Sequence, residues 1–150
     1  MWVLEGNYQG ERNFTFEGLT AAKNRRLTWR NKIAAARQSK GTLLFDDAEF
    51  KIALLNELNQ NLNSAAAFAV VDQNDLLSPA AAKILDDLFG LNPLADSPDL
   101  PAPAKTLIEK REQARKSKDW ATADQLRNQL LEFNLVVKDT PDGPLWQYAS

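Results

Sequence analysis

The sequence predicts a mainly α-helical protein: an antiparallel helical bundle followed by a small tail made of an α-hairpin and a two-stranded β-hairpin. Three observations lead to this fold class. Apolar residues recur at helical spacing through residues 1–91, four prolines interrupt that pattern within 92–104, and two short apolar runs flank a turn sequence near the end of 105–150. We therefore expect a bundle, a proline-rich linker and a small α/β domain.

The first half of the bundle is expected to hold two helices. Thr15 can act as the N-cap of the first, which continues to about Gln38, ahead of the breaking residue Gly41. Asp46 or Asp47 can cap the second helix. Its apolar residues recur at steps of four: Phe50, Leu54, Leu58 and Leu62.

The second half of the bundle is expected to add two more helices. Asn63 or Ser64 can cap the third. The fourth begins after Ser78, with Pro79 at a first-turn position, and ends at Gly90. Short connections between four helices favour an antiparallel bundle.

The segment after the bundle is expected to be irregular, because closely spaced prolines oppose helix formation and stiffen a linker. Beyond it, residues 105–116 and 119–133 read as two helices joined by a tight turn, with Asp119 as N-cap. Residues 135–137 and 145–148 then flank a turn sequence and predict a β-hairpin. The side chains expected to join the hairpin to the helices are Leu126, Leu130, Val136 and Trp146.

Composition excludes several classes of site. The chain has no Cys, hence no disulfide, thiolate ligand or thiol nucleophile. It has no His, which excludes histidine acid–base catalysis, Ser-His-Asp triads and nearly all zinc chemistry. Its glycines form no phosphate-binding loop, and no run approaches the ~20 apolar residues of a membrane span. Nor does the start read as a secretory signal. We therefore expect this chain alone to be neither an enzyme nor a membrane protein.

Charge is strongly segregated behind a formal net charge of −2. Residues 23–40 hold seven Lys and Arg side chains and no acid, whereas residues 41–104 hold ten acids and two lysines. Such asymmetry favours one face that meets a polyanion. A solvated basic helix explains the same pattern, so charge alone decides nothing.

The last third combines an aromatic side chain, guanidinium groups and short carboxylates at the ends of short elements. These groups suit unstacked RNA bases, because an aromatic ring offers a stacking face while Asp and Arg bond to base edges. From the residues alone, the interpretation is a helical bundle with a small RNA-binding tail.

The same segment resembles the C-terminal end of cysteinyl-tRNA synthetases. The string that carries the resemblance is Arg111-x-x-Ala114-Arg115-x-x-Lys118-Asp119-Trp120-x-x-Ala123-Asp124-x-x-Arg127-x-x-Leu130, followed by Asp139-Thr140-Pro141-x-Gly143-x-x-Trp146. Weaker similarities lie in order before it, at Tyr8-Gln9 with Asn13-Phe14-Thr15, at 59–67 and at 84–91.

This resemblance implies a tail that binds the anticodon loop and a bundle that lies along the tRNA stem. Carried over by position, the anticodon contacts would be Arg115, Trp120, Asp124 and Asp139, and the phosphate contacts Arg25, Arg26 and Arg30. The implied partners are cysteine tRNA and the catalytic half of the synthetase, in the cytoplasm. ATP and zinc would belong to that catalytic half, whose motifs this chain lacks, and no cofactor or metal is expected here.

Some positions depart from the family pattern. Asn61 and Ser64-Ala65 replace the usual Asp and Thr-Pro of the helix junction, and Pro144 stands where a Thr is common. Purely structural roles also compete with RNA contacts. Trp120 and Trp146 could be core residues, and Asp119 suits an N-cap better than a base reader.

The two remaining acids have structural alternatives as well. Asp124 could pair with Arg111 or Arg127, and Asp139 could initiate its turn. Two other functions stay open: a free-standing paralogue that acts as a protein-interaction module, and a fragment of a related ligase that joins cysteine to a sugar amine.

Overall fold

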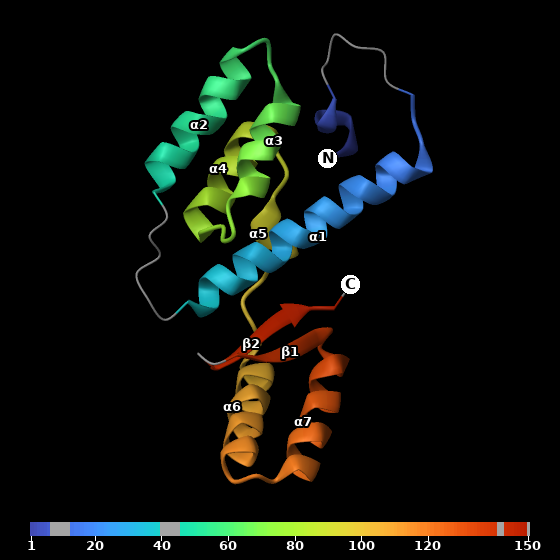
Figure 1. The fold of residues 1–150 in the computed structure, drawn as a ribbon, viewed down its shortest axis with the longest axis vertical. Helices are drawn as coiled ribbons and strands as arrows, with labels where there is room; N and C mark the ends of the chain where they lie inside the picture. The colour runs from blue at the N-terminus through green and yellow to red at the C-terminus, as the bar shows by residue number, and fades with distance from the viewer. Residues whose placement is uncertain (7–12, 40–45, 141–142, 150) are drawn as a thin grey trace. The chain divides into compact units, whose positions relative to one another are not determined.

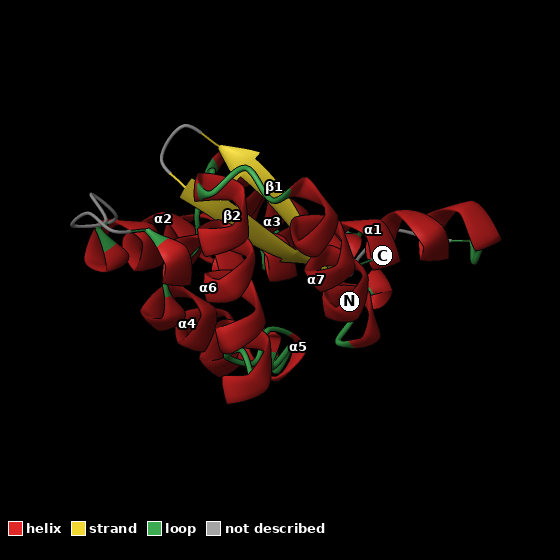
Figure 2. Cartoon of the chain, turned by 90° about the horizontal axis from the view of Figure 1, so that it is seen from below, coloured by secondary structure: helices red, strands yellow, loops and turns green. Residues whose placement is uncertain are grey.

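A computed structural model describes residues 1–6, 13–39, 46–140 and 143–149. The chain is mainly helical and carries one two-stranded antiparallel sheet near its C-terminus (Figures 1 and 2), so the predicted fold class is confirmed. It forms two compact units, residues 1–97 (unit 1) and 98–150 (unit 2). The similarity noted at Tyr8-Gln9 and the break expected at Gly41 lie outside the described residues.

Unit 1 contains the four predicted helices and two short ones. Its elements are the 3-10 helix Trp2–Glu5, then α1 (Phe16–Gln38), α2 (Asp47–Asn59), α3 (Ser64–Gln73), α4 (Pro79–Phe89) and α5 (Pro93–Asp96). Figure 1 shows α2, α3 and α4 alternating in direction, while α1 crosses them obliquely.

The helix starts of unit 1 are set by side-chain caps. Thr15, Asp46, Asn63 and Ser78 each accept a hydrogen bond from a backbone N–H in the first turn of the following helix. These bonds satisfy donors that have no partner inside a helix. The caps predicted for α1, α2 and α3 are thereby confirmed, with Asp46 and Asn63 chosen from the two alternative pairs, and Ser78 is a further cap that was not predicted from the sequence. Gly90 ends α4 in the left-handed conformation, with φ of 64°.

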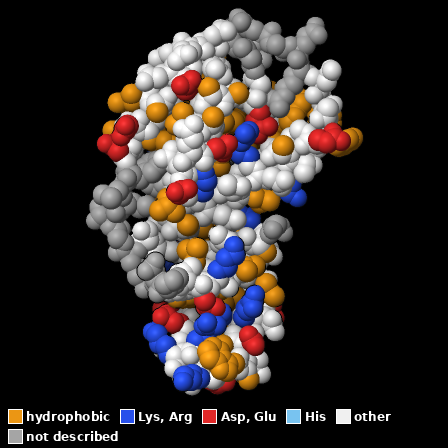
Figure 3. Space-filling view, viewed as in Figure 1, with side chains coloured by type: hydrophobic (Ala, Val, Ile, Leu, Met, Phe, Trp, Pro, Cys, Tyr) orange, Lys and Arg blue, Asp and Glu red, His pale blue; other side chains and the backbone are white. Residues whose placement is uncertain are grey.

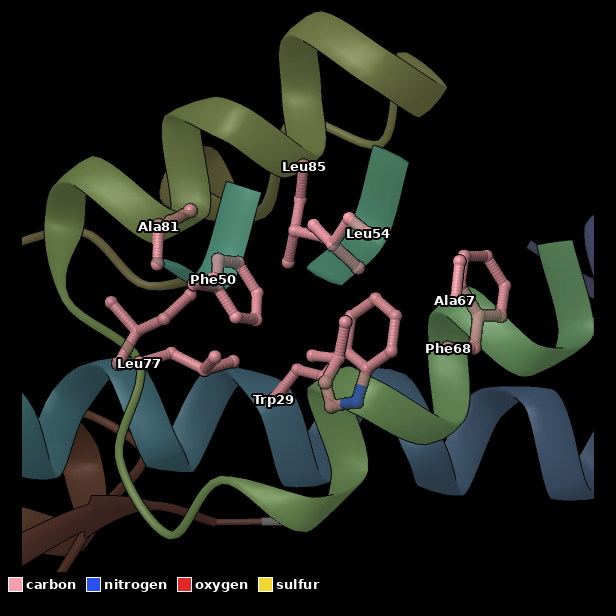
Figure 4. Close-up of a cluster of buried hydrophobic side chains, with 11 residues drawn as sticks. Trp29, Phe50, Leu54, Ala67, Phe68, Leu77, Ala81 and Leu85 are labelled. Carbon is pink, nitrogen blue, oxygen red and sulfur yellow. The ribbon is translucent and has the colours of Figure 1, made fainter. Parts of the chain in front are cut away.

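The core of unit 1 centres on Trp29 of α1 (Figure 4). Its ring meets Phe68 edge to face at a centroid distance of 5.1 Å, and its indole N–H donates to Asp72 at 2.7 Å. Leu54 and Leu85 are fully buried beside it. Burial of these apolar side chains is what holds the helices together.

The four-residue repeat of α2 extends less far than expected. Phe50 and Leu54 are buried and Leu58 packs against the core, but Leu62 is 60% exposed. The reason is that α2 ends at Asn59, and Leu62 has a φ of 52°, so helical periodicity no longer applies there.

The proline-rich segment after α4 was expected to be irregular, but it contains helical residues. Helix α5 begins at Pro93, and α6 (Ala102–Lys116) has Pro103 in its first turn. A proline is tolerated there because the missing N–H would have no intrahelical partner.

Unit 2 places a β-hairpin against a helical hairpin. After α6 come α7 (Trp120–Glu132), β1 (Leu135–Thr140) and β2 (Gly143–Tyr148), and Val137 of β1 pairs with Trp146 of β2. The buried side chains include Leu130, Leu135, Val137 and Trp146.

The four side chains expected to join the hairpin to the helices are buried to different extents. Leu130 and Trp146 are buried, whereas Leu126 and Val136 are only half-buried. Successive strand residues point to opposite faces, so burial of Leu135 and Val137 turns Val136 away from the core.

Candidate nucleic-acid interface

The turn between α6 and α7 is closed by backbone hydrogen bonds. The N–H of Asp119 donates to the carbonyl of Ala114 at 2.8 Å, and that of Lys118 donates to Arg115 at 3.0 Å. This pair of bonds is a Schellman motif, and Lys118 occupies its left-handed position with φ of 60°. The turn brings the end of α6 next to the start of α7.

Asp119 caps α7, as predicted. One of its oxygens accepts from the backbone N–H of Thr122 at 3.1 Å and the other from the Thr122 hydroxyl at 2.6 Å. These two bonds favour the ionised carboxylate and lower the pKa of Asp119. With both oxygens bonded to Thr122, Asp119 orients the helix that begins with Trp120.

Arg111 and Asp139 form a two-bond ion pair. Nη1 and Nη2 of Arg111 lie 2.8 and 2.9 Å from the two carboxylate oxygens of Asp139. The Arg111 side chain is 4% exposed and that of Asp139 is 38% exposed, so the pair joins the interior of unit 2 to its surface. The hydrogen bonds from Arg111 lower the pKa of Asp139, and the same bonds raise the pKa of Arg111.

Arg115 connects this pair to Trp120. Its Nη1 lies 3.0 Å from Oδ2 of Asp139, and its Cζ lies 5.5 Å from the centre of the Trp120 ring. Arg111 and Arg115 share one face of α6 because they are four residues apart. A guanidinium group held at this distance from an indole is stabilised by the quadrupole of the ring.

Trp120 is a surface residue, since 55% of it is exposed. The alternative that it belongs to the core is therefore wrong, whereas Trp146 is buried at 6%. Asp124 is also exposed and forms no ion pair with Arg111 or Arg127 among the described residues. Asp139 lies within β1 and its carboxylate pairs with arginines. Starting a turn is therefore not its only structural role.

The surface around this cluster is mixed in charge. On unit 2, Figure 3 shows Lys and Arg side chains lying among Asp and Glu, with an exposed apolar patch between them. Such a surface does not attract polyanions by bulk charge alone. Any recognition here would depend on the placement of individual groups.

Two of the three predicted phosphate contacts on α1 are engaged by acids. Arg25 contacts Glu5 at 2.6 Å and Asp72 at 3.0 Å. Arg26 forms a two-bond pair with Asp96, which raises the pKa of Arg26. The third predicted phosphate contact, Arg30, is half-buried. To contact phosphates, Arg25 and Arg26 would have to exchange these carboxylate partners for phosphate groups.

Sequence reasoning identified three of the four members of the cluster and missed Arg111. The sequence did contain a hint. Arg111 lies one helical turn before Arg115, so both can face the same way, and Asp139 follows in the expected hairpin. Burial of an arginine cannot be read from such a spacing, because it depends on where the hairpin packs.

The residues that the structure describes include neither a metal-ion cluster nor a helix suited to a bilayer. Across the described ranges, no group of three or more His, Cys, Asp or Glu side chains is arranged to hold a metal ion. Within the same ranges, no helix combines the length and apolar character that crossing a bilayer requires.

Comparison with known proteins identifies relatives of both parts of the chain. Residues 97–146 match the family described as the cysteinyl-tRNA ligase anticodon binding domain. A cysteine–tRNA ligase of Chlamydia abortus is 31% identical over 166 residues, which cover 95% of this chain and 35% of the relative. One of Finegoldia magna is 27% identical over 178 residues, covering 100% of this chain and 37% of the relative.

A shorter match has a higher identity. A cysteine–tRNA ligase of Lactobacillus helveticus is 55% identical over 40 residues, or 27% of this chain and 8% of the relative. The chain therefore spans little more than a third of the length of the relatives that match it throughout. The resemblance carried by the C-terminal string is confirmed, and neither alternative function is favoured.

Proposed function

Through residues 97–146 the chain belongs to the family of cysteinyl-tRNA ligase anticodon-binding domains, and we propose that it recognises the anticodon loop of cysteine tRNA. It would hold the tRNA while the catalytic part of a cysteine–tRNA ligase acylates the 3′ end. Binding of ATP and zinc would belong to that catalytic part, and the protein would act in the cytoplasm.

The observation that carries the proposal is the exposed indole of Trp120 with the Arg115 guanidinium 5.5 Å from its centre. An exposed ring at a helix start offers a stacking platform for an unpaired base. The guanidinium beside it supplies N–H donors for a base edge or a phosphate. Together these groups provide the two contacts that single-stranded RNA recognition uses most.

The two carboxylates add selectivity to this platform. Asp124 is exposed and Asp139 keeps 38% of its side chain exposed, so both can accept hydrogen bonds from amino or imino groups of bases. Carboxylates repel phosphates, and a loop that binds here must therefore present base donors to them.

The bundle would bind the phosphates of the stem. Arg25, Arg26 and Arg30 are the proposed residues, and neutralising one of them should reduce the slope of log affinity against log salt by at most about 1. Because Arg25 and Arg26 pair with acids, we expect their contribution to be smaller than that of free cations. An Arg26→Gln variant with an unchanged slope would remove that residue from the interface.

The test is a binding titration of the full chain with cysteine tRNA and with the same tRNA carrying another anticodon. Measurements at about 50 mM and about 200 mM salt separate phosphate binding from base recognition, since both tRNAs offer the same phosphates. The proposal expects tighter binding of the native anticodon at both concentrations. Equal binding of the two tRNAs would sink it.

Replacement of Trp120 sharpens the test. We expect Trp120→Ala to weaken binding of cysteine tRNA by roughly 5- to 150-fold, since stacking on one base is worth about 1–3 kcal/mol. Phe133→Ala is the matched control: Phe133 is an aromatic that is 39% exposed at the opposite end of α7. Similar losses in both variants would mean that Trp120 has no special role.

A further inference from the structure

Arg111 is placed where it cannot touch RNA, yet it bonds to a residue that can. Its side chain is 4% exposed, and both terminal nitrogens bond to Asp139. Its Nε is buried without a hydrogen-bond partner among the described residues. The fork with Asp139 is thus what orients this guanidinium, and the same two bonds fix the plane of the carboxylate.

The carboxylate of Asp139 has little acceptor capacity left. An ionised carboxylate offers about four lone-pair positions. Nη2 of Arg111 and Nη1 of Arg115 both lie within 3.0 Å of Oδ2, while within the described part of the chain Oδ1 accepts only from Nη1 of Arg111. The freer acceptor position is therefore on Oδ1, and Arg111 sets its direction.

Arg115 depends on the same carboxylate. Oδ2 of Asp139 holds one end of the Arg115 guanidinium at 3.0 Å, while the group lies over Trp120. A long, flexible side chain gains directional specificity only when such a contact restricts its rotamers. The order of dependence runs from the interior outward: Arg111, Asp139, Arg115, Trp120.

We propose that Arg111 is a positioning residue of the anticodon site, which fixes Asp139 and through it Arg115 so that their acceptor and donor groups discriminate between bases. This inference rests on the proposed function. It assigns Arg111 an effect on selectivity between anticodons, whereas a merely structural residue would affect the binding of every tRNA alike.

The experiment compares full-chain variants by the ratio of affinities for cysteine tRNA and the anticodon-swapped tRNA. Arg111→Met keeps the aliphatic length and removes the fork, and we expect the ratio to fall about tenfold or more. Lys110→Met removes one positive charge from the neighbouring, exposed position of α6 and should leave the ratio unchanged. Arg111→Lys keeps the charge without the two-bond geometry and should give an intermediate ratio.

A double variant guards against loss of folding when only one partner of the pair is replaced. Replacing both partners, Arg111→Met with Asp139→Asn, leaves no buried charge without its counter-ion and should fold better than Asp139→Asn alone, in which Arg111 stays buried. Its ratio should equal that of Asp139→Asn alone, because Arg111 acts only through Asp139. If the affinity ratio of the double variant lies well below that of Asp139→Asn alone, the inference is overturned.

The outcomes separate the two hypotheses. If the wild type prefers the native anticodon and Arg111→Met weakens both tRNAs equally, Arg111 is structural only and the inference is wrong. If the wild type shows no preference between the tRNAs, the proposed function itself is wrong. If Lys110→Met keeps the preference for the native anticodon and Arg111→Met loses it, both the proposed function and the inference are supported.

Discussion

At the scale of single residues, Asp139 links stability to recognition. Its carboxylate contacts two arginines, and one of them is almost fully buried. Removal of Asp139 would leave the Arg111 guanidinium in the interior without its counter-ion, which is costly. A loss of tRNA binding in an Asp139 variant must therefore be compared with its folded fraction.

We predict that Asp139 makes the stability of unit 2 sensitive to acid. The hydrogen bonds from Arg111 lower the pKa of Asp139 below its ordinary value of about 3.9. A carboxyl with a lower pKa in the folded state adds stability above its unfolded pKa, and this is lost as pH falls through the folded pKa. We expect a loss of no more than about 1 kcal/mol below about pH 4, because 38% exposure lets solvent screen the pair.

Hydrogen exchange of unit 2 between about pH 2.5 and about pH 6 measures this effect. Asp139→Asn should flatten the acid dependence and lower the stability at neutral pH by about 1–3 kcal/mol, because Arg111 stays buried. Asp124→Asn is the control, since Asp124 is exposed and forms no ion pair in the described ranges. An Asp139→Asn variant as acid-sensitive as wild type would contradict the prediction.

At the scale of elements, the α6–α7 turn holds the platform together. Lys118 adopts a left-handed conformation that glycine adopts without strain, and the Schellman bonds around it fix the start of α7. Trp120 is the first residue of that helix. The turn thus decides where the backbone of Trp120 lies, and the contact with Arg115 acts on its ring.

We predict that Lys118→Gly stabilises the chain by about 0.5–1 kcal/mol, because glycine relieves the steric cost of the left-handed conformation. Thermal melting measures the change. Lys118→Ala removes the same charge but keeps the Cβ, and it should bring no gain. A gain of equal size in both variants would assign the effect to charge instead of conformation.

At the scale of the whole molecule, each compact unit has its own core. Trp29, Phe68 and Leu85 belong to unit 1, and Leu130 and Trp146 to unit 2. Each core is closed by residues of its own unit, with unit 2 relying on a helical hairpin because two strands alone are marginal.

We predict that core variants act on one unit at a time. Leu85→Ala and Leu130→Ala each remove a fully buried side chain and should each cost about 2–5 kcal/mol. Hydrogen exchange should show lower protection in unit 1 for the first and in unit 2 for the second. Loss of protection throughout the chain in either variant would show that the two units unfold together.

The sequence by itself determined the local structure. Helical periodicity, the caps at Thr15, Asp46 and Asn63, and the hairpin signature each follow from interactions within a few residues. The resemblance carried by the C-terminal string likewise singled out Arg115, Trp120, Asp124 and Asp139 as candidate base contacts. Such signals depend on neighbouring residues, so they can be read from the sequence alone.

Only the tertiary structure decided which groups meet. The pairing of Arg111 with Asp139 joins residues far apart in the sequence, and the acids that engage Arg25 and Arg26 lie in other elements. Strand periodicity leaves open which face of β1 is buried, and the packing buries Leu135 and Val137 while Val136 stays half-buried. Burial and long-range pairing depend on how elements pack, which is why the positioning role of Arg111 appears only in the fold.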